Sequence, residues 1–198
     1  MKHLFAAVSV GALLIAAPAW AQNAPNPGAG AAQPLSQQDQ TFVKEAGAGN
    51  LAEADAGKLA MEKGGTPAIR EFGRWMYTDH DLVANNWLKA IMAAQNQPFQ
   101  PTLTAEQQEM QQRFERLRGR QFDREYTQAQ LAMHEKTIPV FQKEATDGQN
   151  PMIKNYAAEL TPVLQQHLAE AKLLAGETGV AARREVRPRE ESGSSTQR

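Results

Sequence analysis

The stretch NPMIKNYAAELTPVLQQHLAEAKLLAG, residues 150–176, decides the fold class. Asn150 followed by Pro151 is typical of a helix N-terminus, and Gly176 is typical of a helix end. Between them the apolar side chains recur every three or four residues, which is the period of a helix with one buried face. The pattern therefore predicts an amphipathic helix over residues 151–175. Its apolar face carries Ile153, Ala157, Leu160, Leu164, Ala171 and Leu174.

The same period continues toward the N-terminus and predicts further helices. Ser36, Thr66 and Thr104 each stand where a helix needs an N-cap side chain. Gly64-Gly65 and the segment 96–101 interrupt the pattern. Runs of alternating β-branched residues, which are typical of strands, do not occur in the sequence. We therefore expect helices over residues 36–63, 67–95, 104–147 and 151–175.

The third of these helical segments is too long for its neighbours. At 1.5 Å per residue, residues 104–147 would extend roughly 66 Å, against about 40 Å for the other helices. Gly119 is the expected break, which leaves a short helix over 104–118 and a long one over 120–147. Short connections favour antiparallel neighbours. The predicted fold is all-α: an antiparallel up-down four-helix bundle with an extra short helix before the third long helix, and with the turns at 64–65 and 148–150 at one end.

The N-terminus differs in composition from the helical part. Residues 1–21 combine a basic start, an apolar run from Leu4 to Ala17 and small residues before a cleavage point, a pattern typical of a secretory signal peptide. The apolar run is about 14 residues long, and a membrane span needs roughly 20. We expect cleavage after Ala21 and a periplasmic mature protein that is not an integral membrane protein.

The chain of 198 residues has room for one domain between two tails. Residues 22–35 are rich in Pro, Gly, Ala and Asn and predict a flexible leader. Residues 36–175 form the predicted bundle domain, and residues 176–198 predict a disordered charged tail. The chain has no cysteine, which excludes disulfides and thiolate metal sites. Its net charge of −1 gives no indication of a nucleic-acid partner.

The same period places Val83 and Trp87 on the apolar face of residues 67–95, and Phe122, Tyr126 and Phe141 on that of residues 120–147. Each predicted apolar face contains one residue that does not suit an apolar core: Glu53, His80, His134 or His167. They include every histidine after the signal peptide. Counted along the helices from the two turns, these four residues lie roughly 17, 23, 21 and 26 Å from the same end. Side chains lean toward the N-terminus of their own helix, which narrows the differences among these four distances to about 6 Å. We expect one polar layer inside the bundle.

The chemistry of this layer has two interpretations. Three imidazole nitrogens and one carboxylate oxygen suit iron, zinc, manganese or copper, so the four residues are candidate metal ligands. The alternative is a metal-free network, in which Glu53 bonds to one histidine while Tyr77, Tyr126 or water satisfies the others. Met76 and Met133 lie beside two of the histidines in the sequence, and a thioether would favour copper.

Other acidic residues are expected outside the layer. Asp79 and Asp81 flank His80 and should point mostly outward as solvated charges. Asp123 lies about 16 Å lower than His134 along its helix. A ferritin-type dinuclear centre needs Glu-x-x-His on two helices. The residues three positions before the histidines are instead Tyr77, Leu131 and Leu164.

The order of several short motifs resembles an exported bacterial family, the domain of unknown function 4142 family. The similarity covers nearly all of residues 36–175 and implies a ferritin-like four-helix fold in the periplasm or envelope, without an established activity. The motifs that carry it are Phe42-Val43, Gly49-Asn50-Leu51-x-Glu53, Lys58-Leu59-Ala60, Met76-x-x-Asp79-His80, Phe122-Asp123-x-x-Tyr126, His134 and His167-Leu168.

Two hypotheses for function follow. The first is an exported ferritin-like protein that holds one transition metal in its core and serves metal handling or stress-related redox chemistry. The second is a non-enzymatic envelope interaction or structural module with a metal-free polar layer, acting with an envelope protein partner or as a homo-oligomer. The sequence leaves open whether the protein is an enzyme, because motifs of the common hydrolases and nucleotide-binding proteins do not occur in it.

Overall fold

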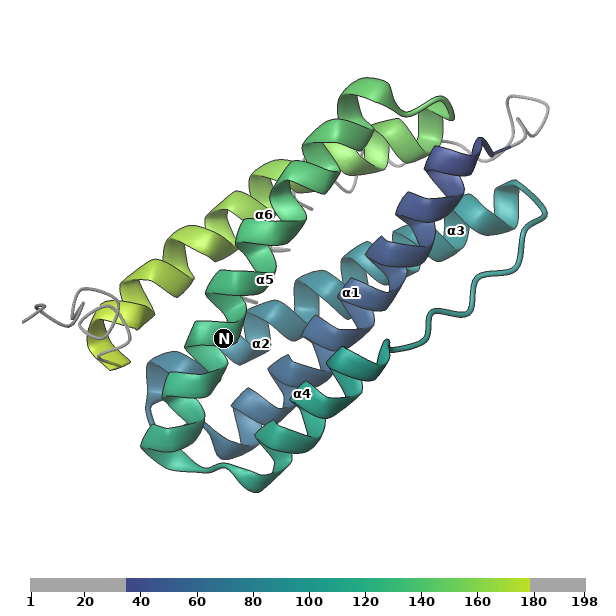
Figure 1. Cartoon of the computed structure of the whole chain (residues 1–198). Helices are drawn as coiled ribbons and strands as arrows, with labels where there is room; N and C mark the ends of the chain where they lie inside the picture. Colours follow the sequence, from purple (N-terminus) through teal and green to yellow (C-terminus); the bar gives the residue numbers. More distant parts are fainter. Residues whose placement is uncertain (1–34, 179–198) are drawn as a thin grey trace, which may run out of the picture.

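The computed structural model describes residues 35–178, and the predicted signal peptide, almost all of the leader and most of the tail lie outside these residues. Within them the protein is all-α with five helices and no sheet (Figure 1). The second helix is continuous but has three segments, α2, η2 and α3. The bounds are α1 Gln37–Lys63, α2 Pro67–Tyr77, η2 Thr78–Asn85, α3 Asn86–Ala94, α4 Ala105–Arg116, α5 Gly119–Asp147 and α6 Pro151–Thr178.

The helices begin where the sequence predicts. Ser36 and Asp39 form a capping box at the start of α1, in which each side chain bonds to the backbone of the other residue. Thr104 and Gln107 repeat the box at α4, and the Thr66 hydroxyl caps α2. The predicted break at Gly119 is confirmed, because α4 ends at Arg116 and Gly119 has a positive φ of 54°. Such a φ strains most other residues.

The two turns between long helices lie at opposite ends of the molecule, so the prediction that they share one end is wrong. The N–H of Gly65, in the first turn, donates to Asp123 near the start of α5, at 2.7 Å. The N–H groups of Gln149 and Asn150, in the second turn, donate instead to Asp39 at the start of α1. The helix α5 is therefore antiparallel to α1, and α6 is antiparallel to α5.

The cause is the connection between α3 and α5. An extended segment and α4 together return along α1 before α5 begins (Figure 1). The Gln111 side chain of α4 donates to the carbonyl of Ala52 at 2.7 Å, and Lys63 at the end of α1 donates to the carbonyl of Glu115. Residues 96–101 were expected only to interrupt the helices, whereas the whole of residues 95–118 forms a crossover from one end of the molecule to the other.

The second helix contains a π-helical segment, η2, which the sequence pattern did not predict. A π-helix has i→i+5 hydrogen bonds and a wider turn than an α-helix. The buried positions consequently change phase after His80: Ala84 and Leu88 are buried, whereas the predicted core positions Val83 and Trp87 are only partly so. The π segment therefore turns the C-terminal part of this helix relative to the predicted register.

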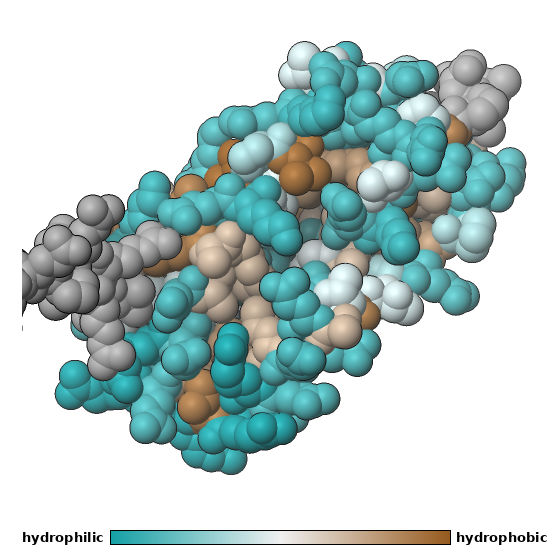
Figure 2. Space-filling view, viewed as in Figure 1, coloured by the Kyte–Doolittle hydropathy of each residue, from teal (hydrophilic) through white to brown (hydrophobic). Residues whose placement is uncertain are grey.

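The apolar core has two clusters with the polar layer between them. One cluster contains the early part of α1, α3 and the early part of α6, and the other contains the late part of α1, α2 and the late part of α6. Along every long helix, the predicted polar residue separates positions of the first cluster from positions of the second. The viewed surface is mainly hydrophilic, with smaller hydrophobic areas (Figure 2), which agrees with apolar helix faces that point inward. None of the described helices is both long and apolar enough to span a membrane.

Candidate metal centre

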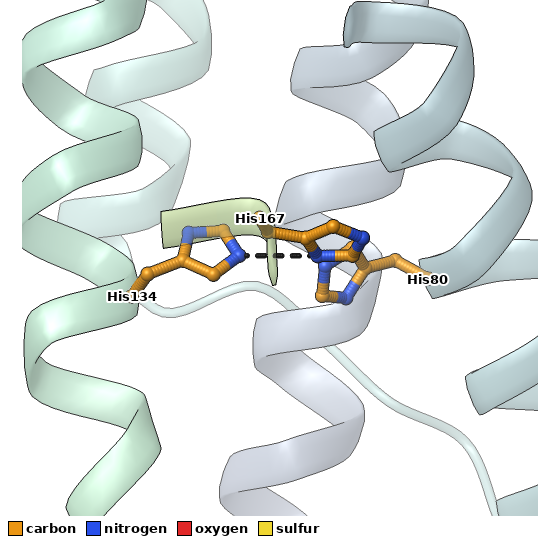
Figure 3. Close-up of side chains that lie close together, drawn as sticks. All are labelled: His80, His134 and His167. Carbon is orange, nitrogen blue, oxygen red and sulfur yellow. Dashed lines mark hydrogen bonds between the residues drawn. The ribbon is translucent and has the colours of Figure 1, made fainter. Parts of the chain in front are cut away.

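Three histidines from three different helices meet inside the protein: His80 of η2, His134 of α5 and His167 of α6 (Figure 3). Each offers one ring nitrogen, and these three nitrogens all lie within 4.8 Å of one another. The exposed fractions of the residues are 4%, 1% and 0%. Buried groups of this polarity need specific partners, so the partners of each ring decide what the cluster can bind.

The ring of His134 is oriented by its own helix. Its Nδ1 lies 2.9 Å from the carbonyl oxygen of Gln130, one turn earlier. A carbonyl only accepts, so Nδ1 carries the hydrogen and donates it. In the neutral ring this leaves a lone pair on Nε2, which faces Nδ1 of His167 at 3.4 Å (Figure 3).

The ring of His167 is oriented by Asp79. Its Nε2 lies 2.9 Å from a carboxylate oxygen of Asp79 on η2, so Nε2 is the donor. The free lone pair of the neutral ring is on Nδ1, the atom that faces His134. The ring of Trp75 also packs edge-on against this imidazole, with ring centroids 5.0 Å apart.

The ring of His80 is oriented from α1. Its Nδ1 lies 3.0 Å from Oδ1 of Asn50, and the amide nitrogen of Asn50 donates to the hydroxyl of Tyr156 at 2.9 Å. Because Asn50 uses its amide nitrogen for Tyr156, its oxygen accepts from His80. The remaining nitrogen, Nε2 of His80, is buried and has no hydrogen-bond partner among the described residues.

The network thus turns three nitrogen lone pairs toward one another and places every hydrogen on the outer side. Metal-binding histidines have this arrangement, in which the nitrogen away from the metal donates to a carbonyl or carboxylate. Tetrahedral coordination with metal–nitrogen distances of 2.0–2.1 Å separates two ligand nitrogens by about 3.4 Å. The distance from His134 Nε2 to His167 Nδ1 is 3.4 Å.

The electrostatics favour the neutral rings that a metal requires. Burial lowers the pKa of His80 well below its usual value, and the nearby His167 and His134 lower it further. Burial also lowers the pKa of His134 to about 4, with a contribution from His167 and a smaller opposing effect of the Gln130 carbonyl. Both rings are therefore neutral at neutral pH and can donate a lone pair to a cation.

Glu53 lies beside His134 but not within the three-histidine group. One of its carboxylate oxygens accepts from the Gln130 side chain at 2.7 Å, and the other is 3.7 Å from Nδ1 of His134, the outer nitrogen of that ring. Burial raises the pKa of Glu53 to about 8, although the bond from Gln130 opposes this shift. The structure thus places all four predicted residues in one layer, and direct ligation by Glu53 stays a prediction.

The outer partners of the rings were not predicted from the sequence. Asp79 was expected to be a solvated charge, but its carboxylate bonds to His167 because the wide π turn brings consecutive residues 79 and 80 to the inner side. Asn50, which orients His80, is a second outer partner that was not predicted. Asp123 lies outside the layer as predicted and binds Gly65 instead. Met76 packs in the apolar cluster with Phe72 and Tyr126.

A comparison with known families gives one match. The family described as Domain of unknown function (DUF4142) matches residues 24–174. No curated protein and no solved structure matches the chain. The match covers the four long helices except for the last four residues of α6.

Proposed function

The chain belongs to the DUF4142 family, whose function is unknown, and on that premise we propose that it binds one transition-metal ion through His80, His134 and His167. The observation that carries the proposal is Nε2 of His80, a buried nitrogen with no hydrogen-bond partner among the described residues. It belongs to a group of ring nitrogens within 4.8 Å of one another. A metal ion would satisfy all three lone pairs at once.

The donor set limits the choice of metal. Imidazole nitrogen suits zinc, copper and iron, whereas manganese prefers oxygen ligands and would also need Glu53. Three histidines in a tetrahedral site leave one position for water or another ligand. A bound zinc ion would act as a Lewis acid there, and iron or copper would exchange single electrons. The role we propose is metal handling or stress-related redox chemistry.

We also propose a ferritin-like arrangement for the four long helices in residues 36–175. One long crossover within a four-helix bundle is typical of ferritin-like folds, and residues 95–118 supply such a connection. The signal-peptide pattern of residues 1–21 supports export to the periplasm, with cleavage after Ala21.

The alternative is a metal-free layer in an envelope interaction or structural module. One observation supports it: Nε2 of His134 and Nδ1 of His167 lie within hydrogen-bond distance of each other, at 3.4 Å. A direct hydrogen bond between the two rings would hold the network together without an ion. This bond would not supply a partner for Nε2 of His80, and for this reason we favour the metal.

Metal titration of the purified protein separates the two proposals. After treatment with a chelator, the protein should bind one equivalent of Zn²⁺ or Co²⁺ by calorimetry. Its melting temperature should rise, because at a free metal concentration of about 100 Kd the native state gains about 2.7 kcal/mol. Co²⁺ should also produce the visible absorption bands of a tetrahedral site.

Variants identify the ligands. His80→Ala and His167→Ala should each remove the visible bands and the rise in melting temperature. Thr127→Val is the control, because Thr127 is a buried residue of α5 about 10 Å along the helix from His134. Wild-type protein that binds no transition metal and melts unchanged with or without the chelator would support the metal-free layer.

A further inference from the structure

Arginine is concentrated at the end of the molecule where α5 begins. The turn after α1 lies at this end, because the N–H of Gly65 donates to Asp123. Among the described residues every arginine lies between Arg70 and Arg124, on the first two turns of α2, the last turn of α4, the link after it and the first two turns of α5. The net charge of −1 for the whole chain gives no sign of this arrangement.

The acidic side chains at this end are mostly engaged by other groups. Glu71 lies 3.5 Å from Nε of Arg74, and Glu125 lies 3.7 Å from Nε of Arg113. Asp123 is 2% exposed and accepts from Gly65. These carboxylates therefore leave the remaining arginines without compensation.

The remaining guanidinium groups are those of Arg116, Arg118, Arg120 and Arg124, and these four residues form the arginine end of the molecule. Their side chains make no hydrogen bond or ion pair among the described contacts. The first three are exposed, and Arg124 is partly exposed. Solvated positive charges that have no partner in the fold are free to bind an anionic partner.

The N-terminus of α5 adds to the positive charge at the same place. Its N-cap is Arg118, whose side chain makes no capping bond, and its first turn contains no acidic residue. The free N–H groups at the start of a helix attract anions. The planar fork of a guanidinium group matches two oxygens of a phosphate group. The arginine end therefore suits phosphate groups in particular.

A planar surface of lipid phosphates fits this arrangement better than a long polyanion does. The arginine end is at one tip of an elongated molecule (Figure 1). In the described residues outside 62–74 and 113–125, acidic side chains outnumber basic ones. A nucleic acid that extended past the tip would meet this negative charge, whereas a membrane surface would contact the tip alone. Clusters of four or more basic residues are typical of binding to anionic lipids.

The C-terminal part of the chain continues the same pattern. Near the end of α6, Leu174 packs in one core cluster with Phe114 and Phe122, so α6 also ends beside the arginine end. Residues 179–198 follow and lie outside the described residues. Their sequence has three glutamates and five arginines, which are Arg183, Arg184, Arg187, Arg189 and Arg198.

We propose that the arginine end docks the protein on a membrane surface of anionic phospholipids. The guanidinium groups pair with lipid phosphates, and the helical bundle extends away from the surface along its long axis. This interaction goes beyond the metal site and does not depend on a bound ion.

The test measures binding of the purified mature protein to lipid vesicles by sedimentation. Wild-type protein should bind vesicles of phosphatidylcholine mixed with phosphatidylglycerol but not vesicles of phosphatidylcholine alone, and binding should weaken as salt is added. The triple variant Arg116→Gln, Arg118→Gln, Arg120→Gln should bind the anionic vesicles roughly tenfold or more weakly. Its melting temperature and its Co²⁺ affinity should equal those of the wild type.

A second triple variant is the matched control. Lys44→Gln, Lys89→Gln, Lys136→Gln makes the same change in charge at exposed positions away from the arginine end, and its vesicle affinity should stay within about threefold of the wild type. Equal losses in the two triple variants would overturn the inference, because binding would then depend only on total charge. So would wild-type protein that ignores the anionic vesicles.

Further measurements distinguish other sources of anionic groups. Inorganic phosphate should displace the protein from vesicles no better than chloride at equal ionic strength, and duplex DNA should bind more weakly than the vesicles do. The opposite results would assign the arginine end to a single phosphate or to nucleic acid. Removal of residues 179–198 should leave binding to anionic vesicles, and a complete loss would assign it to those residues instead. Each of these results would overturn the inference and leave the proposed metal site standing, since metal titration tests that site separately.

Discussion

Asp79 and His167 are 88 residues apart in the chain, and their side chains are joined by a contact of 2.9 Å between Oδ2 and Nε2. Asp79 is the neighbour of His80 in the sequence. The segment η2 therefore provides one candidate ligand directly and orients a second one on α6 through the adjacent residue. Consecutive side chains of an ordinary α-helix diverge by about 100°, and the larger number of residues per turn in a π-helical segment narrows this angle.

The charge of Asp79 should strengthen metal binding. Asp79→Asn keeps an oxygen that can accept from His167 but removes the negative charge, so we expect Zn²⁺ affinity to fall roughly 10–100-fold. Competition with a chromophoric chelator measures this change. Asp81→Asn is the control, because Asp81 lies on the same segment and has no bond to a histidine among the described contacts. Equal losses in the two variants would contradict the role of Asp79.

Asn50 should contribute to stability even without metal, because it satisfies two buried groups. Asn50→Ala leaves both the outer nitrogen of His80 and the hydroxyl of Tyr156 without their partner. We expect a loss of about 1–3 kcal/mol in the free energy of unfolding. Tyr156→Phe removes only one hydrogen bond and should cost about 0.5–1.5 kcal/mol. Urea unfolding in the presence of a chelator measures both, and a larger loss for Tyr156→Phe would contradict this account.

Two glycines of α1 should respond to alanine in opposite ways. A Cβ at Gly57 would lie 2.6 Å from the carbonyl oxygen of Gly73, so α1 and α2 would have to separate. We expect Gly57→Ala to cost about 1–3 kcal/mol. A Cβ at Gly49 has no atom within 4 Å, and Gly49→Ala should stabilise the helix by about 0.5–1 kcal/mol. Thermal unfolding of the pair tests the packing directly, and equal signs would show that the helices do not approach as described.

The contact between the start of α1 and the end of α5 should depend on pH. Burial raises the pKa of Glu144 above its usual value; the bond from Gln38 and the charge of Lys143 oppose this shift, and the neighbouring Asp39 adds to it. The folded protein therefore holds a proton on Glu144 more strongly than the unfolded chain does. Stability from this group is present below the unfolded pKa of about 4.5 and is lost as the pH rises through the folded value.

Glu144→Gln imitates the protonated acid and should remove this loss. The free energy of unfolding of the variant minus that of the wild type should increase as the pH rises above about 4.5. Urea unfolding between pH 4 and 8 measures the difference, in which the contributions of unaltered groups cancel. Glu45→Gln, at an exposed position of α1, is the control. A difference for Glu144→Gln that changes with pH no more than that of the control would contradict the prediction.

The inward faces of three long helices were predictable because they follow one period. Phe122, Tyr126, His134 and Phe141 of α5 are all buried at the predicted positions. The apolar residues that the stretch 150–176 predicts for the inner face of α6 are buried as well. N-caps and glycines fixed the helix ends to within a few residues, since these residues satisfy backbone groups locally. Such signals depend only on residues close in the sequence.

The direction of α5 was not predictable in this way. Its orientation depends on where residues 95–118 lead the chain, and contacts such as Gln111 with Ala52 decide this over a long sequence separation. The predicted meeting of the histidines nevertheless held, because these residues lie near the middle of helices that are about 40 Å long. A residue near the middle of a helix stays at about the same distance from both ends of the bundle when the helix runs in the opposite direction.

The π segment escaped prediction for a related reason. A wide turn in a helix has no local residue signature comparable to a cap, and here its benefit arises from partners on other helices. His80 binds Asn50 of α1, and Asp79 binds His167 of α6. A sequence scan with a fixed period therefore misplaced Val83 and Trp87 and treated Asp79 as a surface charge.

The segment Thr78–Asn85 also constrains how the length of this protein can change. Its buried positions after His80 lie one residue later than in an unbroken α-helix, so deletion of one residue within the segment would restore ordinary winding and leave Leu88 and Ile91 on the core side. The cost of such a deletion would fall on Asp79 and His80, whose side chains would lose the wide turn that they share. A deletion here would therefore disturb the histidine cluster more than the packing of the core. We expect relatives that lack the cluster to tolerate a segment that is one residue shorter.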